Sequence, residues 1–144
     1  MILLDTNILV YAHRARAKEH SAAKRILVFA IDDPRGCGIA VATVTEFFAV
    51  VTDGRNPDRP STPKEAAAFI ASLENGGGVR IWTSGQHFLA RLLQLAHELG
   101  VHGARIFDLQ IALIGTENGA TEIWTRDARF VKVPGLRIVD PFDQ

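Results

Sequence analysis

The sequence has few features that would stabilise or localise a protein by unusual means. A single cysteine, Cys37, excludes an internal disulfide framework and any cysteine-based zinc site, and it fits a reducing compartment. No apolar run approaches the roughly 20 residues needed to cross a bilayer. The N-terminus lacks the basic-then-apolar layout of a signal peptide. We therefore expect a cytoplasmic protein without a membrane segment.

An excess of charge of either sign is also missing. Sixteen Lys and Arg balance sixteen Asp and Glu, so the formal net charge is zero. Long-range attraction to nucleic acid is not indicated, and any such binding requires a local patch. The chain of 144 residues shows no internal repeat, low-complexity segment or linker. Its length is enough for one core and too short for two, which predicts a single domain over residues 1–144.

Short apolar runs alternate with helical patterns along the chain. This alternation predicts an α/β fold in which a short-stranded, mainly parallel sheet is flanked by helices. The expected strands cover residues 1–4, 38–41, 79–82, 121–124 and 137–139. The expected helices cover residues 6–12, 20–31, 43–52, 63–74, 86–99 and 106–117, and the last of these is apolar nearly all round and should be central. Residues 53–63, which include Pro57, read as an exposed loop.

Four acids occupy related places in this pattern. Asp5 and Asp127 follow short apolar strands, whereas Glu46 and Asp108 are predicted in first helical turns. Strand ends and the helix starts that follow them lie on one rim of a parallel sheet, so we expect the four acids to converge there. Two carboxylates about 4 Å apart repel by roughly 4 kcal/mol at an effective dielectric of 20. Such a cluster must bind a proton or hold a cation.

Oxygen ligands without cysteine or paired histidine favour a hard ion, Mg²⁺ or Mn²⁺. A carboxylate-held Mg²⁺ suits phosphodiester hydrolysis, because the ion polarises the phosphoryl oxygen and lowers the pKa of a bound water. No Ser-His-Asp or Cys-His arrangement is legible, and the run at residues 76–78 precedes a strand, the wrong order for a phosphate loop. The acids are therefore the main candidates for chemistry.

Three of the acids also have purely structural explanations. Asp5 can be a helix N-cap, although Thr6 or Asn7 can cap the same helix. Glu46 fits a capping box with a threonine three residues earlier, at position 43. Asp108 gains from the helix dipole. The sequence by itself leaves these explanations open beside the metal-site hypothesis.

Four segments, in order along the whole chain, resemble one known family. They are residues 4–9 (Leu-Asp-Thr-Asn-Ile-Leu), 45–47 (Thr-Glu-Phe), 107–112 (Phe-Asp-Leu-Gln-Ile-Ala) and 125–130 (Thr-Arg-Asp-Ala-Arg-Phe). The sequence resembles the PIN-domain ribonucleases, specifically the VapC-type toxins of bacterial and archaeal toxin–antitoxin pairs. This resemblance implies a three-layer α/β/α fold and a Mg²⁺-dependent endoribonuclease, with Mn²⁺ as a possible substitute.

The resemblance also implies roles for individual residues. The acids Asp5, Glu46, Asp108 and Asp127 would be catalytic and would bind the metal. The supporting residues would be Thr6, Asn7 and Thr125. Many members carry another acid two residues after the fourth; here that position is Arg129, which suggests a contact to RNA phosphate instead. The basic residues considered for RNA contact are Arg14, Arg16, Lys18, Arg25, Arg105, Arg126 and Arg129, each with a solvated charged face as the alternative.

The implied partners are an RNA substrate, a cognate VapB-type antitoxin whose tail inhibits the site, and a second copy of the chain in a homodimer. Two other functions stay open. A phosphatase of the haloacid-dehalogenase type also places an Asp after its first strand, but it expects an acid two residues later, where this chain has Asn7. A non-catalytic PIN-like module would bind RNA or protein and cleave nothing.

Overall fold

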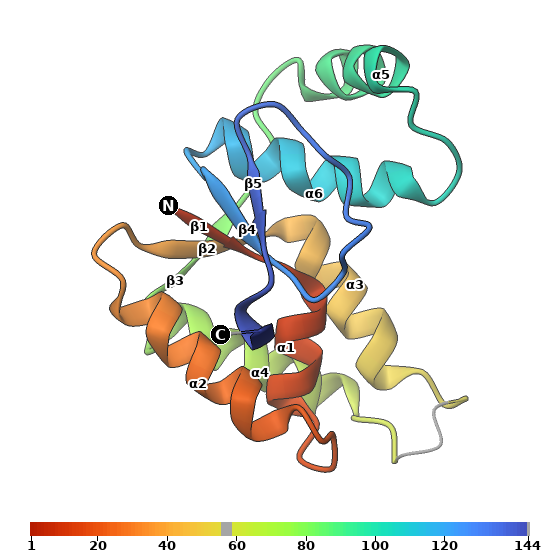
Figure 1. Cartoon of the computed structure of the whole chain (residues 1–144). Coiled ribbons are helices and arrows are strands. Elements are labelled where there is room, and N and C mark those ends of the chain that lie inside the picture. Colours follow the sequence, from red (N-terminus) through yellow and green to blue (C-terminus); the bar gives the residue numbers. More distant parts are fainter. Residues whose placement is uncertain (56–58, 144) are drawn as a thin grey trace.

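A five-stranded sheet with helices on both faces forms the molecule (Figure 1). The computed structural model describes residues 1–55 and 59–143. Its strands are β1 (Ile2–Leu4), β2 (Cys37–Ala40), β3 (Val79–Trp82), β4 (Glu122–Trp124) and β5 (Arg137–Val139). Their order is β3-β2-β1-β4-β5, and each neighbouring pair is parallel. The predicted α/β fold is therefore confirmed, and over the described residues the sheet is parallel throughout.

Within the described residues, six α-helices connect and cover these strands. They are α1 (Thr6–His13), α2 (His20–Asp32), α3 (Val41–Thr52), α4 (Pro63–Asn75), α5 (Phe88–Leu99) and α6 (Arg105–Glu117). A short 3-10 helix, η1 (Pro141–Asp143), follows β5 and was not expected from the sequence. The predicted exposed loop at residues 53–63 lies partly outside the described residues, Pro57 included. None of the described helices has the length and apolar character needed to cross a bilayer.

Alternation along β1 divides the core into two layers. Ile2 and Leu4 pack with side chains of α1, α2, α3 and α4, whereas Leu3 packs with those of α5 and α6. All three residues are fully buried, because successive side chains of a strand point to opposite faces and both faces are covered. Figure 1 shows α5 and α6 on one side of the sheet, and α2 and α4 on the other.

A glycine brings the central helix directly against the central strand. A Cβ on Gly115 of α6 would lie 2.6 Å from Leu3 Cδ2, far inside a normal contact distance. The helix can therefore approach β1 closely only because residue 115 has no side chain. As predicted, α6 is central, and residues 109 and 111–115 of it are buried.

The prediction for the start of α3 is wrong. This helix begins at Val41, two residues earlier than expected, and its N-cap, Ala40, makes no side-chain capping bond. Glu46 therefore lies beyond the first turn, and the Oγ1 atom of Thr43 is buried without a hydrogen-bond partner. The predicted capping box does not form, so capping does not explain Glu46.

A capping box forms at α4, although none was predicted there from the sequence. The backbone N–H of Glu65 donates to Thr62 Oγ1 at 3.1 Å, and the backbone N–H of Thr62 donates to Glu65 Oε1 at 3.3 Å. Pro63 at the first helical position has no N–H to satisfy. These contacts fix the point at which the chain enters α4.

Candidate active site

Asp5 lies at the carboxyl end of β1 and is only 7% exposed. Its Oδ1 accepts a hydrogen bond from the backbone N–H of Thr6 at 2.8 Å and so caps α1. The prediction that Thr6 or Asn7 is the cap is therefore wrong, because α1 already begins at Thr6. A carboxylate has two acceptor oxygens, and capping occupies one of them. Asp5 is both a cap and a site residue.

The second oxygen of Asp5 is held from the neighbouring strand. Thr125, directly after β4, donates its hydroxyl to Asp5 Oδ2 at 2.6 Å. The Asn7 side-chain amide donates to Asp5 Oδ2 at 3.1 Å and to Thr125 Oγ1 at 3.0 Å. The backbone N–H of Arg126 donates in turn to Asn7 Oδ1 at 3.2 Å. These bonds join the ends of β1 and β4 and fix the rotamer of Asp5.

The turn after β4 presents Asp127. Its backbone N–H donates to Thr125 Oγ1 at 3.0 Å, and its Oδ1 accepts from the backbone N–H of Arg129 at 2.8 Å. Thr125 is buried, whereas Asp127 and Arg129 are exposed. One buried hydroxyl therefore positions two acids, Asp5 through its proton and Asp127 through its lone pair.

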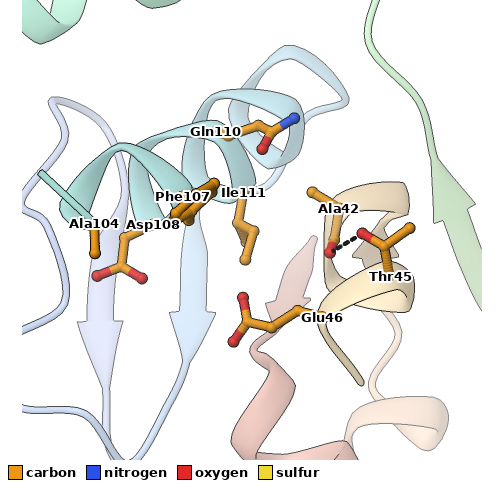
Figure 2. Close-up of a pocket in the computed structure, with 8 residues that line it drawn as sticks. All are labelled: Ala42, Thr45, Glu46, Ala104, Phe107, Asp108, Gln110 and Ile111. Carbon is orange, nitrogen blue, oxygen red and sulfur yellow. Dashed lines mark hydrogen bonds between the residues drawn. The ribbon is translucent and has the colours of Figure 1, made fainter. Parts of the chain in front are cut away.

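Glu46 and Asp108 reach the same region from helices. Both line a cavity of about 500 Å³ between α3 and α6. Figure 2 shows the two carboxylates directed toward one opening, with Ile111 on the cavity wall between them. The remaining wall is formed by Ala42, Thr45, Ala104, Phe107 and Gln110.

The pKa values of Asp5, Glu46 and Asp108 are raised, in part by the charges of neighbouring acids. Burial is the main cause of the raised pKa of Asp108, about 6, and the charges of Asp5 and Asp127 add to it while Arg105 opposes it. Burial also raises the pKa of Glu46, with further contributions from the charges of Asp5 and Asp108. The four carboxyl groups therefore form one interacting set, as the sequence predicts.

The pKa of Asp5 is raised by burial as well, and to a lesser extent by the charge of Asp127. The hydrogen bonds from Thr125, Thr6 and Asn7 oppose this shift, because they stabilise the charged carboxylate. These hydrogen bonds therefore offset part of the cost of burying the charged carboxylate, while the pKa of Asp5 remains raised.

The donor chemistry of this rim fits a hard divalent cation. It offers carboxylate oxygens from four segments of the chain, and the buried hydroxyl of Thr6 lies beside Glu46. Within residues 1–55 and 59–143, however, no three Asp, Glu, His or Cys side chains stand close enough to form a ready-made ion cage. The acids thus surround an open rim, and their roles as metal ligands stay a prediction.

Comparison with known proteins supports this picture. The PIN domain family model matches residues 2–136. This chain belongs to the PIN domain family. Ribonuclease VapC43 of Mycobacterium tuberculosis is 32% identical over 144 residues, which cover 99% of this chain and 97% of that protein. The resemblance to VapC-type proteins seen in the sequence is thereby confirmed.

Solved structures show the same fold. The crystal structure of Mycobacterium tuberculosis VapC20, described as a Sarcin-Ricin loop cleaving toxin, superposes with a TM-score of 0.67 at 15% identity and covers 90% of this chain and 92% of that one. VapBC2 from Rickettsia felis, bound to a DNA fragment from its promoter, gives 0.64 at 19% identity and covers 96% and 98%. At these identities the likeness concerns architecture alone.

Three of the predicted basic residues lie in the same segments as Asp108 and Asp127. Arg105, at the start of α6, donates to the carbonyl oxygen of Arg129 at 2.9 Å. Arg126 pairs with Glu19 at 3.3 Å and lies over the Phe142 ring at 5.1 Å from its centroid. The charge of Arg105 opposes the raised pKa of Asp108, whereas the guanidinium of Arg126 is directed to Glu19 and Phe142.

The other basic candidates lie elsewhere. Arg14 follows the C-terminal end of α1, eight helical residues or about 12 Å from Asp5, and donates to the carbonyl oxygen of Val50. Arg16 lines a separate cavity with Arg14. Lys18 lies 3.9 Å from Glu19, and Arg25 lies on α2 in a cavity that Phe29 also lines. The structure does not bring these four into the site.

One residue of the cavity beside the acids was not predicted from the sequence to have a functional role. Phe107 precedes Asp108 on α6 and is 59% exposed in the cavity that Glu46 also lines. In the sequence it belongs to a helix that is apolar nearly all round, where an aromatic residue reads as core. Its position directly before a candidate ligand was the only available signal.

Proposed function

We propose that this PIN domain is a Mg²⁺-dependent endoribonuclease and acts as the toxin of a VapBC-type pair. The observation that carries the proposal is the set of four interacting acids at the carboxyl edge of a parallel sheet: Asp5, Glu46, Asp108 and Asp127. The curated relative at 32% identity is named a ribonuclease, which supports the same activity here.

Each acid has a distinct means of placement. Asp5 and Asp108 are the principal candidates to hold the ion, since Asp5 is buried, Asp108 is half-buried and both carry raised pKa values. Asn7 and Thr125 orient Asp5, and Glu46 and Asp127 are the two further carboxylates of the proposed site. When bound there, Mg²⁺ or Mn²⁺ would polarise the phosphoryl oxygen and lower the pKa of a bound water. The protein's own contribution is fixed carboxylate geometry and flanking arginines for phosphate.

The partner in this proposal is a cognate VapB-type antitoxin that inhibits the site. The solved VapBC2 of Rickettsia felis supports such a partner by its similar fold. We also propose a homodimer acting in the cytoplasm, in line with the family resemblance.

Cleavage of RNA by the purified protein tests the proposal. We expect discrete fragments from total cellular RNA with Mg²⁺ and none with EDTA. Asp5→Asn and Asp108→Asn should lower the rate by roughly a hundredfold or more, the scale of losing one transition-state electrostatic contact. Asparagine is a good N-cap, so Asp5→Asn can keep the start of α1 intact.

The matched control is Asp32→Asn, which changes an exposed carboxylate at the end of α2 and should leave cleavage unchanged. Circular dichroism of each variant checks the fold. Full activity in either site variant would overturn the residue assignment. RNA binding without cleavage by the wild-type protein, with Mg²⁺ present, would instead support the non-catalytic module.

A further inference from the structure

The cavity between α3 and α6 continues beyond the acids that border it. Glu46 and Asp108 supply its two carboxylates, and the other lining residues are neutral. Its volume of about 500 Å³ falls within the range of sites that hold a small organic group. Because no Lys or Arg lines it, the cavity has no positively charged side chain to attract a phosphate.

Phe107 is the largest apolar side chain on the cavity wall. It is 59% exposed, whereas its neighbours Leu109 and Ile111 on the same helix are buried in the core. The ring therefore adds little to the packing of α6. It lies beside Asp108, as Figure 2 shows, so a group resting on the ring would be next to the acidic rim.

We propose that Phe107 stacks on an unpaired base of the RNA, next to the phosphate that is cut. The inference rests on the proposed function and assigns one side chain to the nucleotide base of its substrate. An aromatic face accepts any base, and only an unstacked base can reach it. Thr45 and Gln110 contribute polar atoms on the same wall, within the cavity that would receive the base edge.

In this arrangement the phosphate and the base of the bound nucleotide occupy regions of different charge. The phosphate would face the acids, with the cation they hold, and the exposed cations Arg105 and Arg129 nearby. The base would enter the neutral part of the cavity, where Ala42, Ala104 and Ile111 present apolar surface. The alternative occupant of the cavity is a side chain of a protein partner, which light scattering distinguishes from an RNA base.

The test compares Phe107→Ala and Phe107→Trp on the Asp5→Asn background, which keeps RNA uncut. The probe is a fluorescently labelled 12-nucleotide single-stranded RNA of mixed sequence, with the same RNA as a duplex for comparison. Phe29, on α2 and 67% exposed, supplies the matched controls Phe29→Ala and Phe29→Trp. Binding is read by anisotropy, and stacking by quenching of the introduced tryptophan.

We expect Phe107→Ala to weaken single-strand binding by about tenfold to a hundredfold, the usual effect of removing one base-stacking ring. Phe107→Trp should restore binding, and the single strand should quench its fluorescence more than the duplex does. Neither Phe29 variant should change affinity or show quenching beyond that of the native tryptophans. Unchanged binding by Phe107→Ala would overturn the inference.

Two further outcomes separate this inference from the proposed function. If the protein with its native Asp5 cuts RNA and the Phe107→Ala variant cuts it with the same KM, stacking is wrong and the nuclease stands. If it does not cut RNA but binding still depends on Phe107, the nuclease is wrong and stacking stands. Light scattering supplies the last check, because loss of binding that accompanies dissociation into monomers would show that Phe107 contacts protein and not RNA.

Discussion

The side chain of Asp5 caps a helix with one oxygen and belongs to the proposed active site with the other. Its Oδ1 completes the first turn of α1, and its Oδ2 accepts bonds from Thr125 and Asn7 at the rim. A substitution that removes both oxygens would therefore disturb the helix start as well as the site. This is why asparagine is the informative replacement, since it retains one carbonyl oxygen for the cap.

At the same scale, Asp108→Asn should stabilise the metal-free protein at pH 7. The folded-state pKa of Asp108 is about 6, above its ordinary value of 3.8, so the folded chain holds this proton more tightly than the unfolded chain does. Stability contributed by the group therefore falls as pH rises from about 4 to 6 and is lost at pH 7. Because Asp108 is partly exposed, we expect roughly 1 kcal/mol, or about 2–4 °C in Tm.

Thermal unfolding in EDTA at pH 4.5 and pH 7 measures this effect. The gain in Tm from Asp108→Asn should be larger at pH 7, and Asp32→Asn should give no comparable gain. Adding Mg²⁺ at pH 7 should stabilise the wild type more than the variant, since only the wild type retains that anionic ligand. A variant less stable than wild type at pH 7 would contradict the assignment of an electrostatic penalty to Asp108.

The element that organises the site is α6. Its close approach to β1 at Gly115 places its first turn, with Phe107 and Asp108, at the carboxyl edge of the sheet. The end of β4 completes the rim through Thr125, which hydrogen-bonds to Asp5 at the end of β1. Small changes in how α6 sits on the sheet should therefore move the acids relative to one another.

Gly115→Ala tests this packing. Alanine favours a helix over glycine by up to about 1 kcal/mol. Here the added Cβ would meet the fully buried Leu3 side chain at 2.6 Å, and overpacking a core costs about 1–3 kcal/mol. We expect the steric term to prevail, with a net loss of roughly 1 kcal/mol in the free energy of unfolding.

Urea denaturation gives the free energy of unfolding for this comparison. Gly54→Ala is the control, because a Cβ there meets nothing within 4 Å and its backbone needs no left-handed angle. It should leave the unfolding midpoint nearly unchanged. Equal or higher stability of Gly115→Ala would mean that Leu3 moves aside easily and that α6 is not held in place by this contact.

At the scale of the whole molecule, charge is balanced and only local patches can attract RNA. The formal net charge is zero, and the arginines in the segments of Asp108 and Asp127 are Arg105, Arg126 and Arg129. The basic residues around α1 form a second group at the far end of that helix. Which group contacts RNA determines how strongly binding depends on salt.

We expect a shallow salt dependence. Each phosphate contact to single-stranded RNA contributes about −0.7 to the slope of log affinity against log salt, so three contacts give roughly −2. Binding of the 12-nucleotide RNA to Asp5→Asn at several KCl concentrations measures the slope. Arg129→Gln should make it less steep, and Arg16→Gln should leave it unchanged. A slope steeper than about −4 would show that the basic group near α1 also contacts RNA.

Much of this protein was determined by local sequence patterns. Short apolar runs and helical spacing predicted every strand and α-helix, because burial on a sheet or a helix face imposes a period on apolar residues. The order of strand, acid and helix placed Asp5 and Asp127 at strand ends, and a parallel sheet brings such ends to one edge. The candidate acids followed from these local rules.

The tertiary structure decided what depends on contacts between distant segments. Asn7 and Thr125 are 118 residues apart in the sequence, and both donate hydrogen bonds to Asp5. The helix α3 begins two residues earlier than predicted, so Glu46 is not a capping residue. In the folded chain Phe107 is exposed beside Asp108, and Arg14 lies about 12 Å from Asp5 along α1. Local periodicity specifies which elements form, whereas exposure and partner choice follow from how those elements pack.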